Sequence, residues 1–204
     1  MIQTQIRIDG ELLSSLTFGA DYLDEYRRVI LQHVAPVTGA FLEWGAGHTT
    51  VALAQLRKEL GVRTLCTIDH NRAYLQAVLA ATPRFEGLRA YARELQGPSC
   101  AVDDPELAYA TAPLAWRESF DFIFIDGRRR MECAFVAALL CHERTVVALH
   151  DYRRARYQAV LAFYDILEDG RQFRVMRLKP ALLGLRPPWE LLDRSIARKP
   201  PPPR

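Results

Sequence analysis

Hydrophobic and polar positions follow two different periods along most of this chain. Short apolar runs, typical of buried strands, occupy residues 40–43, 63–68, 88–93, 120–125 and 145–149. Apolar residues recur at the spacing of one helix face in residues 22–35, 49–60, 72–81, 131–141 and 155–167. Because strands and helices alternate, the pattern predicts an α/β fold: a doubly wound, mostly parallel sheet with helices on both faces.

The C-terminal part departs from this pattern. Residues 173–178 alternate between apolar and polar positions, which predicts a further strand, and residues 181–185 could pair with it across a turn at Lys179 and Pro180. The sequence therefore predicts an antiparallel C-terminal hairpin. Beyond it, residues 199–204 are prolines flanked by basic residues, which predicts a disordered tail.

These patterns divide the chain into three parts. Residues 1–35 form an N-terminal helical segment packed on the core, residues 36–186 form the main domain, and residues 187–204 form a Pro-rich tail. Within the main domain, residues 96–115 make a long polar connection that contains three prolines. This connection could be a lid over a substrate or a plain surface excursion, and the sequence leaves both readings open.

Composition agrees with one globular domain. The chain has 204 residues, 50% of them hydrophobic, which is enough to bury a single core. No apolar run approaches the roughly 18 residues of a membrane span, and the N-terminus is too polar for a signal peptide. We therefore expect a cytoplasmic protein with no membrane partner. The four cysteines, Cys66, Cys100, Cys133 and Cys141, lack C-x-x-C spacing and are expected to be free thiols. Of these, Cys66, Cys133 and Cys141 are expected to have no function.

The turn between the first predicted strand and the next helix carries the most informative motif. Gly45 and Gly47 stand between the apolar run 40–43 and the helical pattern that starts near Thr49. Gly45 can adopt a positive φ without steric cost, and Gly47 lets a ligand approach the backbone beside the N–H groups of the helix start. This is where α/β proteins bind nucleotide-like cofactors, and we expect Thr49 to contribute to the same site.

Two cofactor classes use such a turn, and the neighbouring residues favour one of them. A dinucleotide site has a third glycine where this chain has Thr50, and Glu43 would repel a pyrophosphate. A carboxylate at position 43 suits the ammonium group of S-adenosyl-L-methionine (SAM). With Glu43, Gly45 and Gly47, the chain resembles the class I SAM-dependent methyltransferases, whose first motif is written E-x-G-x-G. The resemblance implies a Rossmann-like sheet with SAM as cofactor.

A second acid strengthens this resemblance. Asp69 ends the second predicted strand, 24 residues after Gly45, where such folds place the acceptor for the ribose hydroxyls. The alternative is a helix cap. Because Asn71 is the better placed N-cap, we expect Asp69 to bind the cofactor.

The ends of the fourth and fifth strands should deliver the chemistry, since ligands of open α/β sheets bind outside the carboxyl ends of the strands. Residues 125–127 read I-D-G and residues 150–152 read H-D-Y. Over residues 40–165 this pairing resembles methyltransferases that are often small-molecule O-methyltransferases. One departure is that no Gly-Gly precedes the fifth strand, where residues 142–144 read H-E-R.

Two mechanisms are open at these strand ends. His150 could remove the acceptor's proton, oriented by Asp126 or Asp151, although a histidine at a strand end is often structural. Alternatively, Asp126 and Asp151 could hold a divalent cation such as Mg²⁺. Tyr152 stands where catechol-type enzymes place an asparagine, so we favour the histidine base without metal. Asp126 is also expected to border the cofactor.

Six arginines follow the same two strands: Arg128, Arg129, Arg130, Arg153, Arg154 and Arg156. They could neutralise Asp126 and Asp151, or they could recognise an anionic acceptor. On the second reading, Arg128, Tyr152 and Arg153 bind the substrate. Nucleic acid is disfavoured because no aromatic platform is interleaved with these arginines.

The sequence thus predicts a SAM-dependent methyltransferase that methylates oxygen on a small or glycosidic, anionic acceptor. The alternatives are a noncatalytic SAM-binding protein of the same fold and, less favoured, a nicotinamide-dependent oxidoreductase. Whether the protein forms a homo-oligomer stays open.

Overall fold

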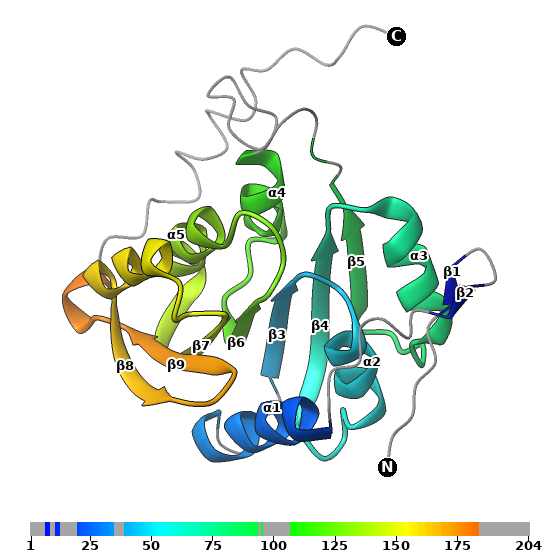
Figure 1. Cartoon of the computed structure of the whole chain (residues 1–204), viewed down its shortest axis with the longest axis horizontal. Helices are drawn as coiled ribbons and strands as arrows, with labels where there is room; N and C mark the ends of the chain where they lie inside the picture. Colours follow the sequence, from blue (N-terminus) through cyan, green and yellow to red (C-terminus); the bar gives the residue numbers. More distant parts are fainter. Residues whose placement is uncertain are drawn as a thin grey trace, which may run out of the picture.

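The structure, a computed structural model, describes residues 7–8, 11–12, 20–34, 39–93, 95 and 107–183. Its centre is a seven-stranded sheet in the order β5-β4-β3-β6-β7-β9-β8 (Figure 1). The strands are β3 (Gly39–Trp44), β4 (Val62–Asp69), β5 (Leu88–Ala92), β6 (Phe120–Ile125), β7 (Cys141–His150), β8 (Tyr164–Asp169) and β9 (Phe173–Leu178). The strands from β5 to β7 run parallel, and β9 pairs antiparallel with both β7 and β8. The predicted Rossmann-like, mostly parallel sheet is confirmed.

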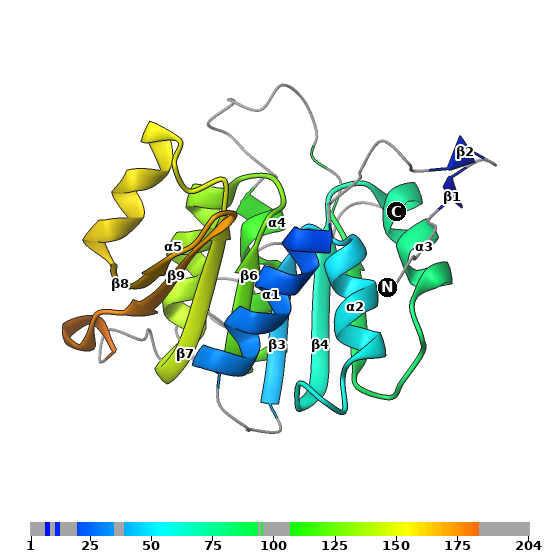
Figure 2. The same ribbon diagram turned by 60° about the horizontal axis from the view of Figure 1, so that its bottom comes forward.

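Helices cover both faces of this sheet, as Figure 2 shows for α1 and α2 in front of it and for α4 and α5 behind it. One layer contains α1 (Ala20–His33), α2 (His48–Gln55) and α3 (Arg72–Ala81). The other contains α4 (Leu107–Thr111), α5 (Arg130–Leu140) and the 3₁₀ helices η1 (Ala112–Trp116) and η2 (Ala155–Ala162). The short strands β1 (Arg7–Ile8) and β2 (Glu11–Leu12) form a separate antiparallel pair.

Apolar clusters on both faces of the sheet hold these layers together. Phe122 and Phe124 of β6 are fully buried against Tyr26 of α1, whereas the intervening Ile123 faces the α4–α5 layer. This alternation follows from the two-residue period of a strand, and a central strand that is apolar on both sides must be covered on both sides. Such burial explains why the strands were predictable as continuous apolar runs.

The C-terminal hairpin is present, but its two strands are not the predicted pair. The helix predicted at residues 155–167 ends at Ala162, and residues 164–169 form β8, which pairs with β9. Part of the predicted partner at residues 181–185 instead forms the 3₁₀ helix η3 (Pro180–Leu182). β8 is the outermost strand and exposes Ile166 and Leu167. Its weak burial pattern therefore did not distinguish a strand from a helix.

Several other predictions can be compared only in part. Cys66, Cys133 and Cys141 are buried and form no disulfide, whereas Cys100, the tail at 199–204 and the stretch 96–106 lie outside the described residues. Residues 107–115 of the predicted long connection are helical. None of the helices in the described part of the chain is long and apolar enough to cross a membrane.

Candidate active site

A cavity of about 280 Å³ lies at the carboxyl edge of the parallel strands. One side is formed by the β3–α2 turn, the start of α2, the end of β4 and α3: Gly45, Ala46, Gly47, His48, Thr49, Asp69, His70 and Tyr74. The other side is formed by α1 and the ends of β6 and β7: Tyr22, Asp126, Gly127, Arg128, Arg130 and His150. The structure therefore brings the glycine motif and the predicted catalytic histidine to one cavity.

The two glycines of the β3–α2 turn serve different purposes. Gly45 has a φ of 97°, and a Cβ atom there would lie 2.5 Å from the backbone nitrogen of Gly127. Gly47 has an extended backbone, and a Cβ atom there would meet only the Tyr74 hydroxyl, at 3.3 Å, among the described residues. Gly45 is thus required by the fold, as its predicted positive φ implies, whereas Gly47 leaves the turn open towards the cavity.

Glu43 lies behind this turn and not in the cavity. Its carboxylate is fully buried and accepts hydrogen bonds from the hydroxyls of Thr49, Thr50 and Thr67. Burial raises the pKa of Glu43 to about 7, although the three hydroxyl donors act in the opposite direction. Thr50 in turn accepts the Gly47 N–H at 2.9 Å. In this structure the carboxylate holds the turn in place and is absent from the cavity lining among the described residues, so its contact with the cofactor stays a prediction.

Asp69 ties the ends of β3 and β4 together at the cavity wall. Its Oδ2 accepts the Ala46 N–H at 3.2 Å, and its Oδ1 accepts the Asn71 N–H at 2.8 Å. Asn71 is the N-cap of α3, as predicted, and accepts the Tyr74 N–H at 3.0 Å. Asp69 is therefore positioned at the cavity, and its bond to a ribose stays a prediction.

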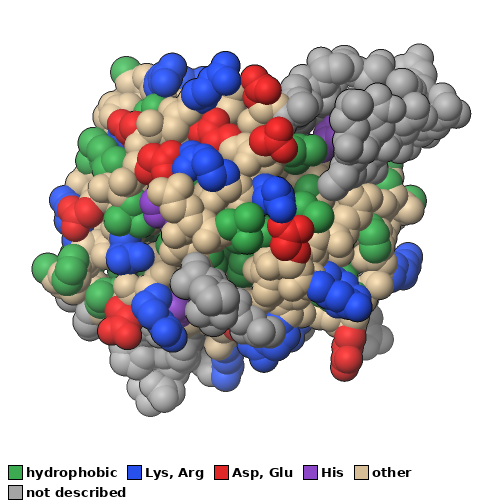
Figure 3. Space-filling model, turned by 90° about the horizontal axis from the view of Figure 1, so that it is seen from below, with side chains coloured by type: hydrophobic (Ala, Val, Ile, Leu, Met, Phe, Trp, Pro, Cys, Tyr) green, Lys and Arg blue, Asp and Glu red, His purple; other side chains and the backbone are tan. Residues whose placement is uncertain are grey.

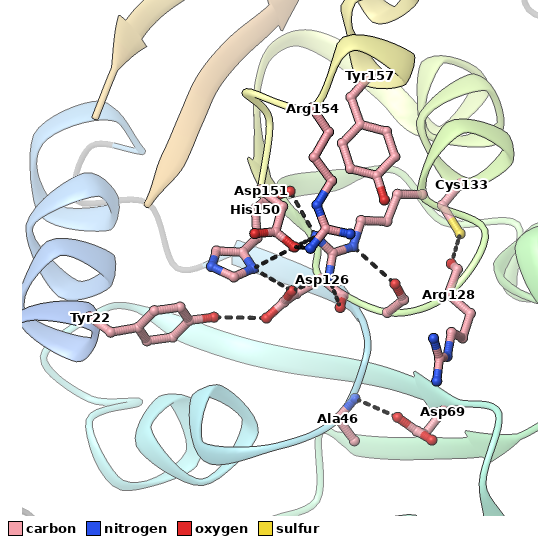
Figure 4. A network of polar contacts seen from close by, with 12 residues as sticks. Tyr22, Ala46, Asp69, Asp126, Arg128, Cys133, His150, Asp151, Arg154 and Tyr157 are labelled. Carbon is pink, nitrogen blue, oxygen red and sulfur yellow. Dashed lines mark hydrogen bonds and ion pairs between the residues drawn. The ribbon is translucent and has the colours of Figure 1, made fainter. Parts of the chain in front are cut away.

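Asp126 is the centre of the opposite wall (Figure 4). Its Oδ1 contacts His150 Nδ1 at 2.7 Å, and its Oδ2 accepts the Tyr22 hydroxyl at 2.9 Å. Tyr22 comes from α1, and its ring packs edge-on against the His150 ring, with centroids 5.4 Å apart. Burial raises the pKa of Tyr22 well above its ordinary value, so its hydroxyl remains a donor. Sequence reasoning missed this tyrosine, because nothing local links α1 to the end of β6.

Asp151 has a smaller part than predicted. Its Oδ2 lies 4.0 Å from His150 Nδ1, too far for a hydrogen bond, and it pairs with Arg130 at 2.9 Å and Arg154 at 2.8 Å. Asp151 is absent from the cavity wall among the described residues. Asp126, and not Asp151, therefore orients His150, and two of the six arginines do neutralise these acids.

The predicted substrate residues separate into two groups. Arg128 borders the cavity, is exposed, and forms no ion pair with any described residue. Tyr152 is buried and donates to the Gly170 carbonyl at 2.9 Å, and its ring contacts the guanidinium of Arg174. Arg153 borders a different groove, beside Glu25 and other acids. Neither Tyr152 nor Arg153 lines the cavity among the described residues, and their substrate roles stay predictions.

Charge on the rest of the surface is mixed. On the face seen in Figure 3, basic side chains lie among acidic ones and do not gather into one broad patch. Arg27 pairs with Glu59 and Arg28 pairs with Glu168, for example. This face has no continuous basic track of the kind that follows a nucleic-acid backbone.

Comparisons with known proteins agree with this site. Residues 42–152 match a family described as a methyltransferase domain. Comparison with curated proteins found no match.

Solved structures share the fold at low sequence identity. A methyltransferase-like protein from Silicibacter pomeroyi is 22% identical with a TM-score of 0.59, and the match covers 94% of this chain and 97% of that one. CalS11, a TDP-rhamnose 3'-O-methyltransferase of calicheamicin biosynthesis, is 12% identical with a TM-score of 0.53, covering 78% and 81%. The fibrillarin pre-rRNA processing protein of Methanococcus jannaschii is 12% identical with a TM-score of 0.51, covering 72% and 69%.

These proteins differ in what their names say they act on, so the shared fold does not identify the acceptor. The family match spans both halves of the cavity, from the end of β3 to the end of β7. It decides against the nicotinamide-dependent alternative and for SAM as the cofactor. This chain belongs to the methyltransferase-domain family and is a SAM-dependent methyltransferase.

Proposed function

We propose that this enzyme methylates an oxygen atom of a small or glycosidic acceptor that carries a negative charge. The observation that carries this proposal is the 2.7 Å contact between His150 and Asp126 in the same cavity as the glycine turn. A hydroxyl group is a poor nucleophile until its proton is removed, and a histidine held by a carboxylate is suited to remove it.

The cofactor would lie against the β3–α2 turn. The residues proposed to bind it are Gly45, Gly47, Thr49, Asp69 and Asp126. The open side of Gly47 offers close approach to the backbone, and Asp69 offers a carboxylate for the ribose hydroxyls. When bound, SAM supplies an electrophilic methyl group. The protein then has to hold the acceptor oxygen in line with that methyl group.

His150 would act as the base. Asp126 accepts from His150 Nδ1, which makes Nε2 the basic nitrogen of the ring. Tyr22 donates to the other oxygen of Asp126 and so fixes the carboxylate, and its ring packs against the imidazole. His150 therefore has one preferred tautomer and a restrained orientation, as a base that must meet a particular hydroxyl requires.

Arg128 would select the negative charge on the acceptor. It stands on the cavity wall, and no described acidic side chain neutralises it. A guanidinium can bind a carboxylate or phosphate through two parallel hydrogen bonds.

The experiment is a methyl-transfer assay with labelled SAM and matched acceptors. Each hydroxylated carboxylate or phosphate is compared with its deoxy analogue and with its neutral ester. We expect transfer only to compounds that keep the hydroxyl, and faster transfer to the anionic member of each pair. Preferred methylation of amines, or equal rates with neutral esters, would contradict the proposal. SAM alone at about 100 times its Kd should stabilise the fold by roughly 2.7 kcal/mol, independently of any acceptor.

A further inference from the structure

Asp126 and Asp151 are the kind of carboxylate pair that a divalent cation uses. They follow the neighbouring parallel strands β6 and β7, and hard cations such as Mg²⁺ bind carboxylate oxygens. In some O-methyltransferases a cation at such a place activates the acceptor hydroxyl. Whether these residues fit a cation depends on what their oxygens already contact.

The side chain of Arg130 lies between the two carboxylates. Its Nη2 donates to Asp126 Oδ1 at 2.8 Å, and its Nη1 donates to Asp151 Oδ2 at 2.9 Å. Arg154 contacts the same Asp151 oxygen at 2.8 Å, and Tyr22 donates to the second oxygen of Asp126. Three of the four carboxylate oxygens, both of Asp126 and Oδ2 of Asp151, are thus engaged by positively charged or hydroxyl donors, and the residues do not fit a metal.

Arg130 also binds the backbone at both strand ends. Nε donates to the Gly127 carbonyl at 3.0 Å, Nη2 to the Asp126 carbonyl at 3.0 Å and Nη1 to the His150 carbonyl at 2.9 Å. One guanidinium therefore joins two carboxylates and three carbonyls. Its side chain is 13% exposed, so water screens these contacts only weakly.

The start of α5 explains how Arg130 reaches this place. Arg129 has a φ of 51° and serves as the N-cap, so the helix begins at Arg130, four residues after Asp126. A guanidinium offers five N–H groups in a planar fork, and this geometry suits acceptors spread over two strand ends. A lysine could supply the charge but not the fork.

We propose that Arg130 is a positioning residue that replaces the divalent cation, so that methyl transfer is independent of metal. It would hold Asp126 and the end of β7 at the distance that sets the orientation of His150. This inference rests on the proposed function only in assigning His150 the role of base. Its central claim, that Arg130 excludes a cation from the carboxylate pair, can be measured without an acceptor.

The test is Mn²⁺ binding followed by electron paramagnetic resonance, with SAM affinity measured on the same samples. The unchanged enzyme should bind no Mn²⁺ at this pair, and a chelator should change neither its thermal stability nor its turnover. Arg130→Ala should gain one Mn²⁺ site with a Kd on the order of 10⁻⁴–10⁻³ M, as in weak sites built from oxygen ligands. Arg130→Ala/Asp151→Asn should lose that site again.

Two further variants separate the effect of the guanidinium's geometry from the effect of its positive charge alone. Arg130→Lys keeps a cation beside the acids, so it should bind no Mn²⁺ but should lower kcat by at least about tenfold with little change in the KM for SAM. Arg156→Ala is the matched control, because Arg156 follows β7 but contacts Tyr157 and neither carboxylate. It should behave like the unchanged enzyme in both measurements.

Several outcomes would overturn the proposal. One is stoichiometric Mn²⁺ binding by the unchanged enzyme that Asp151→Asn abolishes, and another is a folded Arg130→Ala without any Mn²⁺ site. If Arg130→Ala does not fold, an Arg130→Lys enzyme with unchanged kcat would be equally decisive. Failure of the proposed O-methylation would appear only in the acceptor assay and would leave the Mn²⁺ results unaffected.

Discussion

Two histidine–aspartate contacts join β6 to β7, one at each end of this strand pair. At the carboxyl end, His150 Nδ1 lies 2.7 Å from Asp126 Oδ1, and at the amino end His142 Nε2 lies 3.2 Å from Asp121 Oδ1. The residue types are the same and both pairs are partly buried. Their surroundings differ completely.

At the carboxyl end, the aspartate also contacts Tyr22 and Arg130, and the pair borders the cavity that contains the glycine turn. At the amino end, Asp121 accepts the backbone N–H of Ala40 at 2.9 Å and so secures the start of β3. A histidine beside an aspartate is therefore no sign of catalysis by itself. What supports the role proposed for His150 is its place at the edge where parallel strands end, beside the glycine turn.

The largest expected effect tests this difference directly. His150→Ala should lower kcat by about 10²–10⁴-fold, the usual contribution of a general base, while SAM affinity changes little. His142→Ala should leave kcat unchanged and cost at most about 1 kcal/mol of stability, as for a partly exposed pair. Steady-state kinetics of both variants measure this, and equal activity of the two would reject the base role of His150.

The second comparison uses the glycines at the two ends of β3. Gly45→Ala places a Cβ atom 2.5 Å from the backbone of Gly127 at a positive φ, so we expect a loss of about 3–5 kcal/mol in unfolding free energy. Gly39→Ala meets the Asp121 side chain, which can move, and should cost less. Denaturant unfolding measures both, and a larger loss in Gly39→Ala would contradict this order.

Gly47→Ala completes this comparison. Its backbone is extended and its Cβ atom has room, so the fold should remain stable while SAM binds more weakly. Calorimetric titration with SAM would separate this variant from Gly45→Ala, whose primary defect is folding.

The third prediction concerns pH. The pKa of Glu43 is raised from 4.5 to about 7, chiefly by burial, so the folded state binds a proton that the unfolded chain has released. The stability contributed by this group is complete below pH 4.5 and is lost as the pH rises through 7. The loss is about 3 kcal/mol, since each pKa unit corresponds to about 1.4 kcal/mol. Glu43→Gln should lack this decline when unfolding is measured from pH 4.5 to 8.

Glu168 provides a control, because its pKa is shifted in the opposite direction to that of Glu43. Hydrogen bonds from Arg28 and then His33 lower its pKa to about 2, so its contribution is present above pH 4.5 and is lost as the pH falls towards 2. Glu168→Gln should therefore lower stability above pH 4.5 and remove the decline towards pH 2. A Glu43→Gln enzyme with the unchanged pH profile would show that Glu43 titrates normally.

The smallest expected effect separates two of the arginines. Arg128→Ala should weaken binding of an anionic acceptor by about 1.5–3 kcal/mol, the value of a charged hydrogen bond, without affecting SAM. Arg128→Lys should restore part of this, because a point charge cannot make two parallel hydrogen bonds. Arg153→Ala, which alters a groove outside the cavity, should leave acceptor KM unchanged. Equal effects of the two alanine variants would contradict the assignment.

The parts of this protein that depend on local chemistry could be predicted from its sequence. A continuous apolar run such as residues 120–125 needs cover on both faces, so it could be identified as a central strand of the sheet. Gly45 was identifiable because a sharp turn from strand to helix favours a positive φ, and Asn71 because a helix start needs an acceptor.

The contacts between polar side chains could not be predicted in this way, because they depend on how the chain folds. Tyr22 and Asp126 are 104 residues apart, and the three threonines around Glu43 come from two separate elements. The sequence placed Arg128, Arg130 and Arg153 in one group, and the structure assigns them to the cavity wall, to the carboxylate pair and to a separate groove. Burial can be predicted from the sequence, because apolar residues recur with the period of the helix or strand that buries them. The partner of an ionic side chain has no such periodicity in the sequence, because it depends on which distant segments come together in the fold.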